Sequence, residues 1–273
     1  MTGEDGDSRP VVCCDLDGVV WRGEQPIPGA AAGIERMRAA GLRVAFLTNN
    51  SGGRIADNLA RLAAAGVTAE AADVVTSAQA AVALLGHDVP PGVRVLACAG
   101  AGVREALLAG GFEPVDAAPA VAVVVGWHRE FDFERLRIAA DVVRSGARFI
   151  ATNLDPTYPG ANGLLPGAGS LVAAVATASG RRPEVAGKPE APMAAFVRAR
   201  YANPVVMIGD RPSTDGAFAD ALGVPFAMVL SGIGGTHGEE HVPDPAPPFV
   251  ADDLGALAPG LADAFGTGAP SYG

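Results

Sequence analysis

The stretch of sequence that decides the fold is VVCCDLDGVV, at residues 11–20. It is an apolar run that ends in two carboxylates, Asp15 and Asp17, followed by Gly18. An apolar run without polar alternation is typical of a buried strand in a parallel sheet. Ligands of open α/β sheets bind just beyond the carboxyl ends of the strands, where these two carboxylates could share a cation or a phosphoryl group. An ordinary turn explains the same residues equally well, because Asp and Gly are common turn formers.

The composition favours one large or two modest globular domains. The chain has 273 residues, 49% of them apolar, which is enough to build substantial cores. The net charge is −10 and the acidic residues are scattered, which argues against nucleic acid or an anionic membrane as a partner. No apolar stretch reaches membrane-spanning length, and residues 1–10 lack the regions of a signal peptide, so we expect a cytoplasmic protein.

The cysteines do not indicate a disulfide framework, since there are only three. Cys13 and Cys14 are neighbours in the predicted first strand, where their side chains would point to opposite faces. Cys98 ends another apolar run. We expect all three to be small buried apolar residues.

Apolar runs alternate with amphipathic, alanine-rich segments along most of the chain, which predicts parallel sheets covered by helices. The predicted strands are 11–15, 43–48, 93–98, 121–126, 148–152, 205–209 and 225–230. The predicted helices are 31–40, 55–65, 78–85, 103–109, 133–145, 170–179 and 192–201. Residues 234–248, rich in Pro, Gly and acid, are predicted to form an irregular loop, and the final residues to fray.

The middle third of the chain has a complete series of three strands and three helices of its own. Segments rich in Gly and Pro flank this series at residues 86–92 and 180–183. We therefore predict a discontinuous core domain, residues 1–84 and 184–273, with a second α/β domain inserted at residues 85–183.

Four polar segments carry the candidate chemistry: Asp15–Gly18, Thr48–Ser51, Gly187–Pro189 and Ile208–Asp215. Each alone has a structural explanation, as a polar turn, a solvated lysine or, for Asp215, the N-cap of a helix. Together they supply what phosphoryl transfer needs, which is a nucleophile, charge neutralisation, donors to the phosphate and a proton donor.

Each part of that chemistry has a candidate residue. Asp15 and Asp210 can offer oxygens to Mg²⁺, which prefers a few carboxylates together with water and phosphate. Thr48 and Lys188 can hold phosphate oxygens. Asp17, one short step beyond Asp15, is placed for acid–base work.

The same motifs resemble those of a known family. DLDGVVW at 15–21, TNNS at 48–51, ATNLD at 151–155, GKP at 187–189 and GDRPSTD at 209–215 are similar in kind and order to the motifs of the haloacid dehalogenase superfamily of aspartate-nucleophile phosphatases. The finer pattern resembles its NagD-like, class IIA branch. The resemblance covers nearly the whole chain and implies an α/β fold, with a Rossmann-like parallel-sheet core and an inserted α/β cap domain.

The resemblance implies catalytic and phosphate-binding roles for five residues. Asp15 would attack phosphorus and form an aspartyl-phosphate intermediate. Asp17 would protonate the departing alcohol and then activate water. Thr48 and the backbone N–H of Asn49 would bind the phosphoryl group, and Lys188 would neutralise it and the nucleophile.

The resemblance also implies a metal site. Mg²⁺ would be held by Asp15, the backbone carbonyl of Asp17 and Asp210, with Asp215 ordering the water shell of the metal or Lys188. An aspartate at position 17 favours hydrolysis, since related ATPases carry threonine there. The segment at 18–28 resembles the short loop and flap that gate the active site in this family.

The expected function is that of a Mg²⁺-dependent phosphatase acting on a small phosphorylated metabolite. Candidate substrates are phosphoglycolate, glycerol phosphate, a nucleoside monophosphate and pyridoxal phosphate. Two alternatives stay open at this point. One is a phosphometabolite-binding or regulatory protein without turnover, and the other is a phosphomutase.

By resemblance, the inserted domain is the cap that selects the leaving group, and its loop at 152–159 looks like the specificity loop of the family. We expect Tyr158 to face substrate, although a partly buried structural tyrosine explains it equally well. Asn153 and Asp155 are expected to shape the loop. The segment WHRE at 127–130 departs from the acidic pattern of the family after the cap strand, which weakens the expectation of cap-derived substrate contacts and of the usual dimer contacts of the family but leaves the expected chemistry unchanged. A homodimer formed through the cap is an open prediction.

Overall fold

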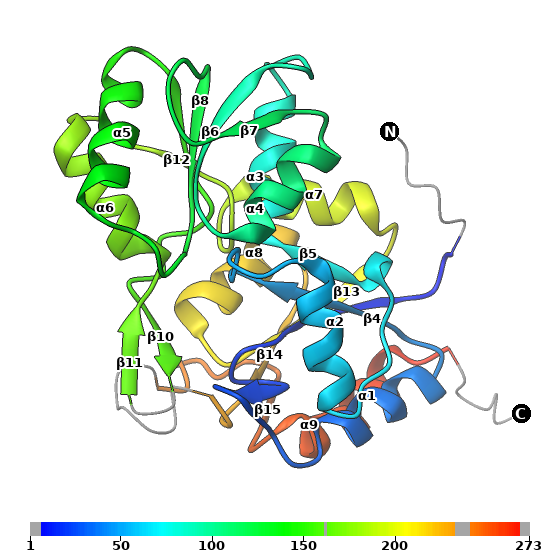
Figure 1. Cartoon of the computed structure of the whole chain (residues 1–273). Helices are drawn as coiled ribbons and strands as arrows, with labels where there is room; N and C mark the ends of the chain where they lie inside the picture. The colour runs from blue at the N-terminus through cyan, green and yellow to red at the C-terminus, as the bar shows by residue number, and fades with distance from the viewer. Residues whose placement is uncertain (1–6, 161–162, 233–240, 268–273) are drawn as a thin grey trace, which may run out of the picture. The chain divides into compact units, whose positions relative to one another are not determined.

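The computed structural model describes residues 7–160, 163–232 and 241–267 (Figure 1). The described chain forms two compact units, which we treat separately. The first comprises Met1–Thr48, Leu59–Val75 and Ala194–Gly273, and the second comprises Asn49–Asn58 and Thr76–Met193. The predicted domain boundaries at residues 85 and 183 stay a prediction.

The first unit is built on a six-stranded parallel sheet. In spatial order its strands are β15 (Phe249–Ala251), β14 (Phe226–Val229), β13 (Pro204–Gly209), β1 (Val11–Asp15), β4 (Arg43–Thr48) and β5 (Val74–Thr76). β1 is central, with Cys14 opposite Ile208 of β13 on one side and Phe46 of β4 on the other. All residues of β1 are buried, which explains why its sequence shows no polar alternation.

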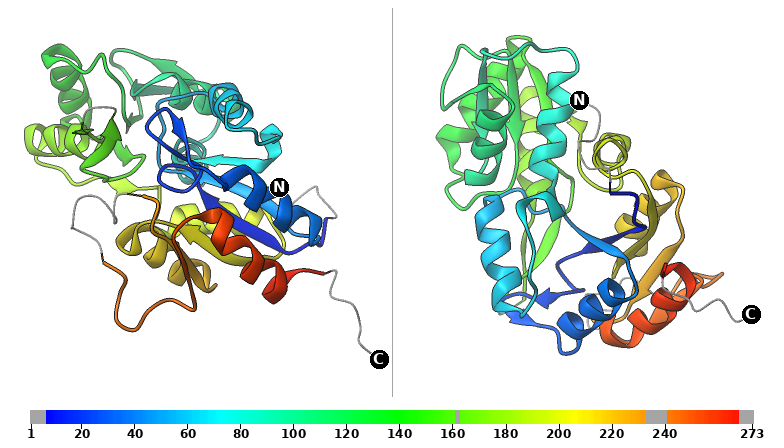
Figure 2. Two further views of the ribbon diagram at one scale, coloured as in Figure 1. Left: turned by 90° about the horizontal axis from the view of Figure 1, so that it is seen from below. Right: turned by 90° about the vertical axis from the view of Figure 1, so that its right-hand side faces the viewer.

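Helices α1 (Ala30–Ala39) and α9 (Leu254–Phe265) pack side by side in this unit (Figure 2). A Cβ atom on Gly33 would lie 2.6 Å from the backbone oxygen of Leu254, so this glycine permits the close approach of the two helices. Helix α9 was not predicted, because Pro259 inside it opposes helix formation. Tertiary packing overrides that preference by burying Leu254, Leu257, Ala258 and Leu261.

The second unit is built on a five-stranded parallel sheet, the cap sheet of the fold. In spatial order its strands are β12 (Glu184–Val185), β9 (Arg148–Ala151), β8 (Ala122–Val125), β6 (Arg94–Cys98) and β7 (Glu113–Val115). Helices α5 (Phe133–Arg144) and α6 (Ala168–Ser179) lie together on one side, and α3 (Ser77–Gly86) and α4 (Ala101–Ala109) on the other (Figure 1). Val123 and Val125 of β8 pack against the α5–α6 side.

The remaining elements are short or lie along the chain where one unit passes into the other. They are α2 (Ile55–Ala64), α7 (Ala191–Arg200), α8 (Ala217–Leu222), a 3₁₀ turn at Ala71–Asp73, a π-helical turn at Pro212–Gly216, and the hairpins β2 (Trp21–Arg22)–β3 (Gln25–Pro26) and β10 (Thr157–Gly160)–β11 (Gly163–Pro166). Hairpin β2–β3 lies within the predicted flap at 18–28. Hairpin β10–β11 begins in the predicted specificity loop.

Each predicted strand and helix corresponds to an observed element whose ends differ by no more than two residues. The strands β5, β7, β12 and β15 were not predicted, because two or three residues carry no clear periodic pattern. Residues 241–248 form neither helix nor strand, as predicted, whereas 234–240 and the final residues 268–273 lie outside the described part of the chain.

The three cysteines are buried thiols outside any disulfide, which confirms their prediction as apolar core residues. Burial raises the pKa of the Cys98 thiol to about 12. In the part of the chain that the structure describes, none of the helices combines the length and the apolar character that crossing a bilayer would need.

His128 is a buried, uncharged side chain of the second unit. Its Nδ1 lies 3.2 Å from the carbonyl oxygen of Gly126 and can donate to it, while Nε2 is buried and, among the described residues, has no hydrogen-bond partner. Burial, supported by the nearby positive charges of Arg135 and Arg104, lowers the pKa of His128 below its ordinary value of 6.5. Protonation would place an N–H at Nε2 without an acceptor, which costs about 1–3 kcal/mol.

We expect the stability of the wild type to decrease between pH 7 and pH 5 in a way that depends on His128. The unfolded chain binds a proton near pH 6.5 and the folded chain only at lower pH, so stability is complete above 6.5 and is lost as the pH falls below it. His128→Asn should flatten this part of the Tm profile by several degrees, measured by differential scanning calorimetry. The exposed His87→Asn is the matched control, and an unchanged profile in His128→Asn would contradict the assignment.

Candidate active site

Three neighbouring strands of the first unit end in polar residues at the same edge of the sheet. Asp15 is the last residue of β1, Thr48 is the last residue of β4, and Asp210 directly follows the last residue of β13. β1 lies between the other two strands, and Asp15 pairs with Leu47, the neighbour of Thr48. The structure thus brings these residues to the edge where α/β sheets bind ligands.

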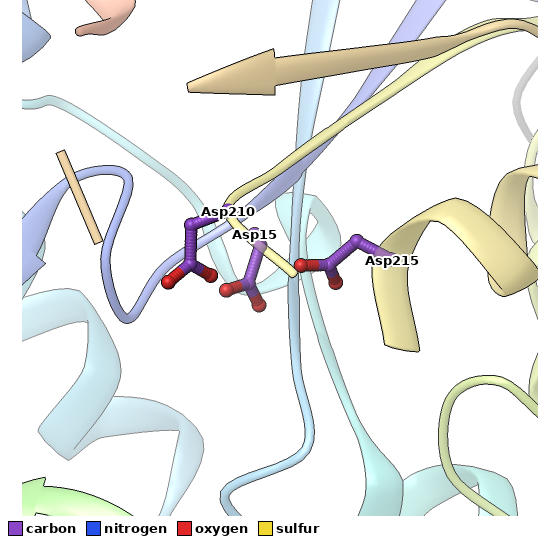
Figure 3. A group of neighbouring side chains, drawn as sticks. All are labelled: Asp15, Asp210 and Asp215. Carbon is purple, nitrogen blue, oxygen red and sulfur yellow. The ribbon is translucent and has the colours of Figure 1, made fainter. Parts of the chain in front are cut away.

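The carboxylates of Asp15, Asp210 and Asp215 converge on one point (Figure 3). One oxygen of each lies within 4.8 Å of the others, and the side chains are 7%, 2% and 2% exposed. Three buried negative charges at this separation repel one another, and a cation compensates such repulsion. Because all the donors are carboxylate oxygens, the set fits a hard cation such as Mg²⁺.

Asp215 reaches this cluster from a π-helical turn that precedes α8. The carbonyl oxygen of Arg211 accepts hydrogen bonds from the N–H groups of Thr214, Asp215 and Gly216, and the Asp215 carboxylate accepts one from the Arg211 N–H at 3.2 Å. The side chain therefore folds back over its own turn instead of capping α8, whose N-cap is Gly216. The N-cap explanation of Asp215 is wrong.

Glycines leave room for two of these carboxylates. Gly18 has a φ of +90°, and a Cβ there would lie 2.5 Å from Oδ2 of Asp210. A Cβ on Gly232 would collide with the same carboxylate, and a Cβ on Gly209 would collide with that of Asp215. Residues with a side chain at these positions would displace the acidic cluster.

Asp17 is half-buried, and its side chain is hydrogen-bonded to a neighbouring indole. Nε1 of Trp21 donates a hydrogen bond of 2.8 Å to Oδ1 of Asp17. The intervening loop is tight, because the carbonyl oxygen of Leu16 accepts from the N–H groups of Val19, Val20 and Trp21. Asp15 and Asp17 therefore have different surroundings although they are two residues apart.

In the second unit, Asn49 fixes the backbone of Lys188. Its side-chain Oδ1 accepts a hydrogen bond from the Lys188 N–H at 2.9 Å, and its Nδ2 donates to the Lys188 carbonyl at 3.0 Å. Nδ2 also donates to Asp155, and the backbone oxygen of Asn49 accepts from Ser77 and Asn153, each at 2.6 Å. Lys188 is only 3% exposed, so this network sets the position of a buried cation.

Asn153 and Asp155 shape the loop in which they lie, as predicted. Oδ1 of Asn153 accepts from the N–H of Asp155 at 3.1 Å, and both side chains hydrogen-bond to Asn49. Tyr158, in β10, is half-buried and packs edge-on against Trp127, with ring centroids 5.3 Å apart. Trp127 in turn donates to the carbonyl of Pro166 in β11.

Comparison with known proteins places the chain in a family. The haloacid dehalogenase-like hydrolase family matches residues 12–113, and the related HAD-hydrolase-like family matches residues 185–257. The chain is 39% identical over 248 residues to the D-glycerol 3-phosphate phosphatase of Mycobacterium tuberculosis, covering 89% of this chain and 69% of that protein. The chain belongs to the haloacid dehalogenase-like hydrolases.

Solved and curated relatives place it within the class IIA, NagD/p-nitrophenylphosphatase-like phosphatases of that family. The structure of the same mycobacterial phosphatase in complex with magnesium superposes with a TM-score of 0.82 at 37% identity, covering 92% of this chain and 77% of that one. Human chronophin is 37% identical over 243 residues, covering 81% of each protein. The 4-nitrophenylphosphatase of Thermotoga maritima matches with a TM-score of 0.82 at 28% identity, covering 92% of this chain and 97% of that one.

Membership of this haloacid dehalogenase branch agrees with the resemblance inferred from the motifs. The roles of two residues near the site, Gly232 and Trp21, were not predicted from the sequence. Gly232 lies just beyond the end of β14, and Asp210 lies just beyond the end of β13. The apolar run at 225–230 was predicted as a strand, so the position of Gly232 after this run could have indicated that it lies near the acidic cluster. Trp21 was included in the first motif without a role, and no local pattern shows that its indole reaches Asp17.

Proposed function

We propose that this protein is a Mg²⁺-dependent phosphatase that hydrolyses a small phosphomonoester through an aspartyl-phosphate intermediate on Asp15. The observation that carries the proposal is the convergence of three buried carboxylates at the carboxyl ends of adjacent strands. Asp15, the backbone carbonyl of Asp17, and Asp210 would hold Mg²⁺. Asp215 would order the water shell of the metal or Lys188. The metal, when bound, supplies positive charge that offsets the repulsion between the carboxylates and an anionic substrate.

The reaction proceeds in two steps on residues of this chain. A carboxylate oxygen of Asp15 forms a bond to phosphorus while the bond from phosphorus to the ester oxygen breaks, and Asp17 gives its proton to that departing oxygen. Water then attacks the phosphoryl group and gives its proton to Asp17. The bond between phosphorus and Asp15 breaks, which releases inorganic phosphate and restores the carboxylate.

Three residues are proposed to hold the phosphoryl group. Thr48 offers its hydroxyl and Asn49 its backbone N–H, while the ammonium of Lys188 neutralises the phosphate and the nucleophile. The side chain of Asn49 is engaged with the Lys188 backbone, so only its N–H is assigned to substrate. In the cap, Tyr158 is proposed to contact the leaving group, because its hairpin begins in the loop that resembles the specificity loop.

Release of phosphate from a panel of esters tests the proposal. The panel contains glycerol 3-phosphate, phosphoglycolate, a nucleoside monophosphate, pyridoxal phosphate and p-nitrophenyl phosphate, each assayed with Mg²⁺ and with EDTA. Glycerol 3-phosphate comes first because the mycobacterial relative is named for it. We expect Mg²⁺-dependent turnover of at least one small ester. Absence of turnover over the whole panel would refute the phosphatase proposal, and a rearranged product that keeps its phosphate would indicate a mutase.

The same panel run on Tyr158→Ala tests the cap assignment. We expect the order of kcat/KM among the metabolite esters to change by about tenfold, while p-nitrophenyl phosphate changes less than threefold. Tyr158→Phe keeps the ring that packs against Trp127 and separates the contribution of the hydroxyl. An unchanged order in Tyr158→Ala would show that Tyr158 is only a structural residue.

A further inference from the structure

Trp21 occupies an unusual position for a core residue, because its one polar atom points at a proposed catalytic carboxylate. The side chain is 2% exposed, and its Nε1 donates to Oδ1 of Asp17 at 2.8 Å. The backbone supports the same geometry: the N–H of Gly18 donates to the Trp21 carbonyl at 2.7 Å, and Asp17 and Trp21 form a β-bridge. The indole is therefore fixed with respect to the loop that carries Asp17.

Arg61 holds the other side of this indole. Its guanidinium carbon lies 4.1 Å from the centre of the Trp21 ring, within the range of a cation–π interaction. Its Nη2 also donates to the carbonyl oxygen of Gly23 at 2.7 Å, just beyond β2. Arg61 lies in the part of α2 that belongs to the first unit, so this part of the helix is linked to the flap hairpin through the tryptophan ring.

The loop that carries Asp17 is also hydrogen-bonded to Ser231, in the segment that follows β14. The hydroxyl of Ser231 donates to the carbonyl of Gly18 at 2.8 Å, and Arg22 donates to the carbonyl of Ser231. The loop is thus held on both sides. A carboxylate that must give and receive a proton in one place benefits from such support, because a small displacement of a catalytic group costs large factors in rate.

We propose that Trp21 is a positioning residue for proton transfer by Asp17, and that Arg61 holds Trp21 in place. The inference rests on the proposed function. Because the indole N–H occupies Oδ1, Oδ2 is the oxygen that carries the proton to the ester oxygen as the bond to phosphorus breaks. The same Oδ2 then receives the proton of the attacking water.

The nature of the leaving group makes this role measurable. An alkoxide leaves poorly and needs the proton of Asp17, whereas p-nitrophenolate leaves readily without it. The ratio kcat/KM reports only the steps up to cleavage of the ester, so it isolates the acid role of Asp17 from its later role as base. Loss of positioning should therefore reduce kcat/KM for an alkyl phosphate much more than for p-nitrophenyl phosphate.

The test uses Trp21→Phe, which keeps a ring under Arg61 and removes only the N–H donor. With Mg²⁺ present, we expect kcat/KM for glycerol 3-phosphate, or the best alkyl ester of the panel, to fall at least tenfold, and that for p-nitrophenyl phosphate less than threefold. Asp17→Asn should show a larger loss with the same preference. In the Asp17→Asn background, Trp21→Phe should have less than a threefold further effect, because its target is already absent.

Two further variants separate positioning from general damage to the fold. Tyr201→Phe is the matched control, since it also removes one hydrogen-bond donor from a buried aromatic side chain, the 2.8 Å bond to Ala72, and should leave both substrates unaffected. Arg61→Met leaves Trp21 intact and should reproduce the selective loss at smaller size, which keeps the proposal testable if Trp21→Phe unfolds.

The outcomes distinguish this inference from the function on which it rests. Equal losses on the two esters in Trp21→Phe, or an undiminished effect of Trp21→Phe in the Asp17→Asn background, would overturn the positioning role. An inactive wild type on both esters would instead refute the phosphatase proposal. Unchanged kinetics in Arg61→Met, with the fold intact by circular dichroism, would overturn the role of Arg61.

Discussion

Replacing Asp15 by asparagine is expected to abolish turnover, with kcat falling on the order of 10³-fold or more. The amide has nearly the shape of the carboxylate, so the buried site should keep its packing, but it lacks the anionic oxygen that attacks phosphorus. The measurement is phosphate release from p-nitrophenyl phosphate with saturating Mg²⁺. Asp220→Asn removes an exposed carboxylate of the same unit and serves as the control, with activity near that of the wild type.

A covalent test identifies the attacked residue directly. Wild-type enzyme quenched in acid during turnover should carry one phosphoryl group on the peptide that contains β1, detected by mass spectrometry and removed by hydroxylamine, as expected of an acyl phosphate. Asp15→Asn should carry none. Retention of activity within tenfold of the wild type in Asp15→Asn, or a phosphoryl group on a different peptide, would show that Asp15 is not the nucleophile.

The core of the fold could be predicted because a strand that is buried on both faces has a recognisable apolar sequence. β1 is enclosed on both faces, so its apolar run shows no alternation, and Asp15 directly follows it. Asp210 follows β13 in the same manner. Since the carboxyl ends of parallel strands share an edge, two short segments of sequence were enough to place both acids at one site.

Contacts between distant side chains could not be predicted in this way. Asn49 binds the backbone of Lys188, 139 residues further along the chain, and nothing local to either residue indicates that partner. Helix α9 was missed for a related reason, because Pro259 disfavours a helix locally while packing against α1 stabilises it. The indole of Trp21 is the same kind of case, since its spacing from Asp17 allows many arrangements and only the folded loop selects one.

Asp210→Asn is expected to weaken Mg²⁺ binding and to lower the Mg²⁺-dependent activity. The variant lacks one of three charges in a cluster whose oxygens lie within 4.8 Å of one another, so it should bind the cation more weakly and lose on the order of 10²-fold or more in activity. The activity assay alone does not separate metal binding from catalysis. The thermal unfolding of the protein without substrate does, because a cation that binds only the folded state raises Tm.

Relative to the wild type, Asp210→Asn is expected to have the higher Tm in EDTA and the lower Tm with Mg²⁺, and this reversal makes the experiment decisive. For the wild type, Mg²⁺ at about 100 times its Kd should add about 2.7 kcal/mol, or roughly 5–10 °C in Tm, relative to EDTA. In EDTA, Asp210→Asn should unfold a few degrees above the wild type, because removing one of three mutually repelling buried charges relieves the folded state. Adding Mg²⁺ should then raise its Tm far less. Asp220→Asn, with the acidic cluster intact, should follow the wild type in both conditions. A Mg²⁺-dependent rise of full size in Asp210→Asn would place the cation elsewhere than among Asp15, Asp210 and Asp215.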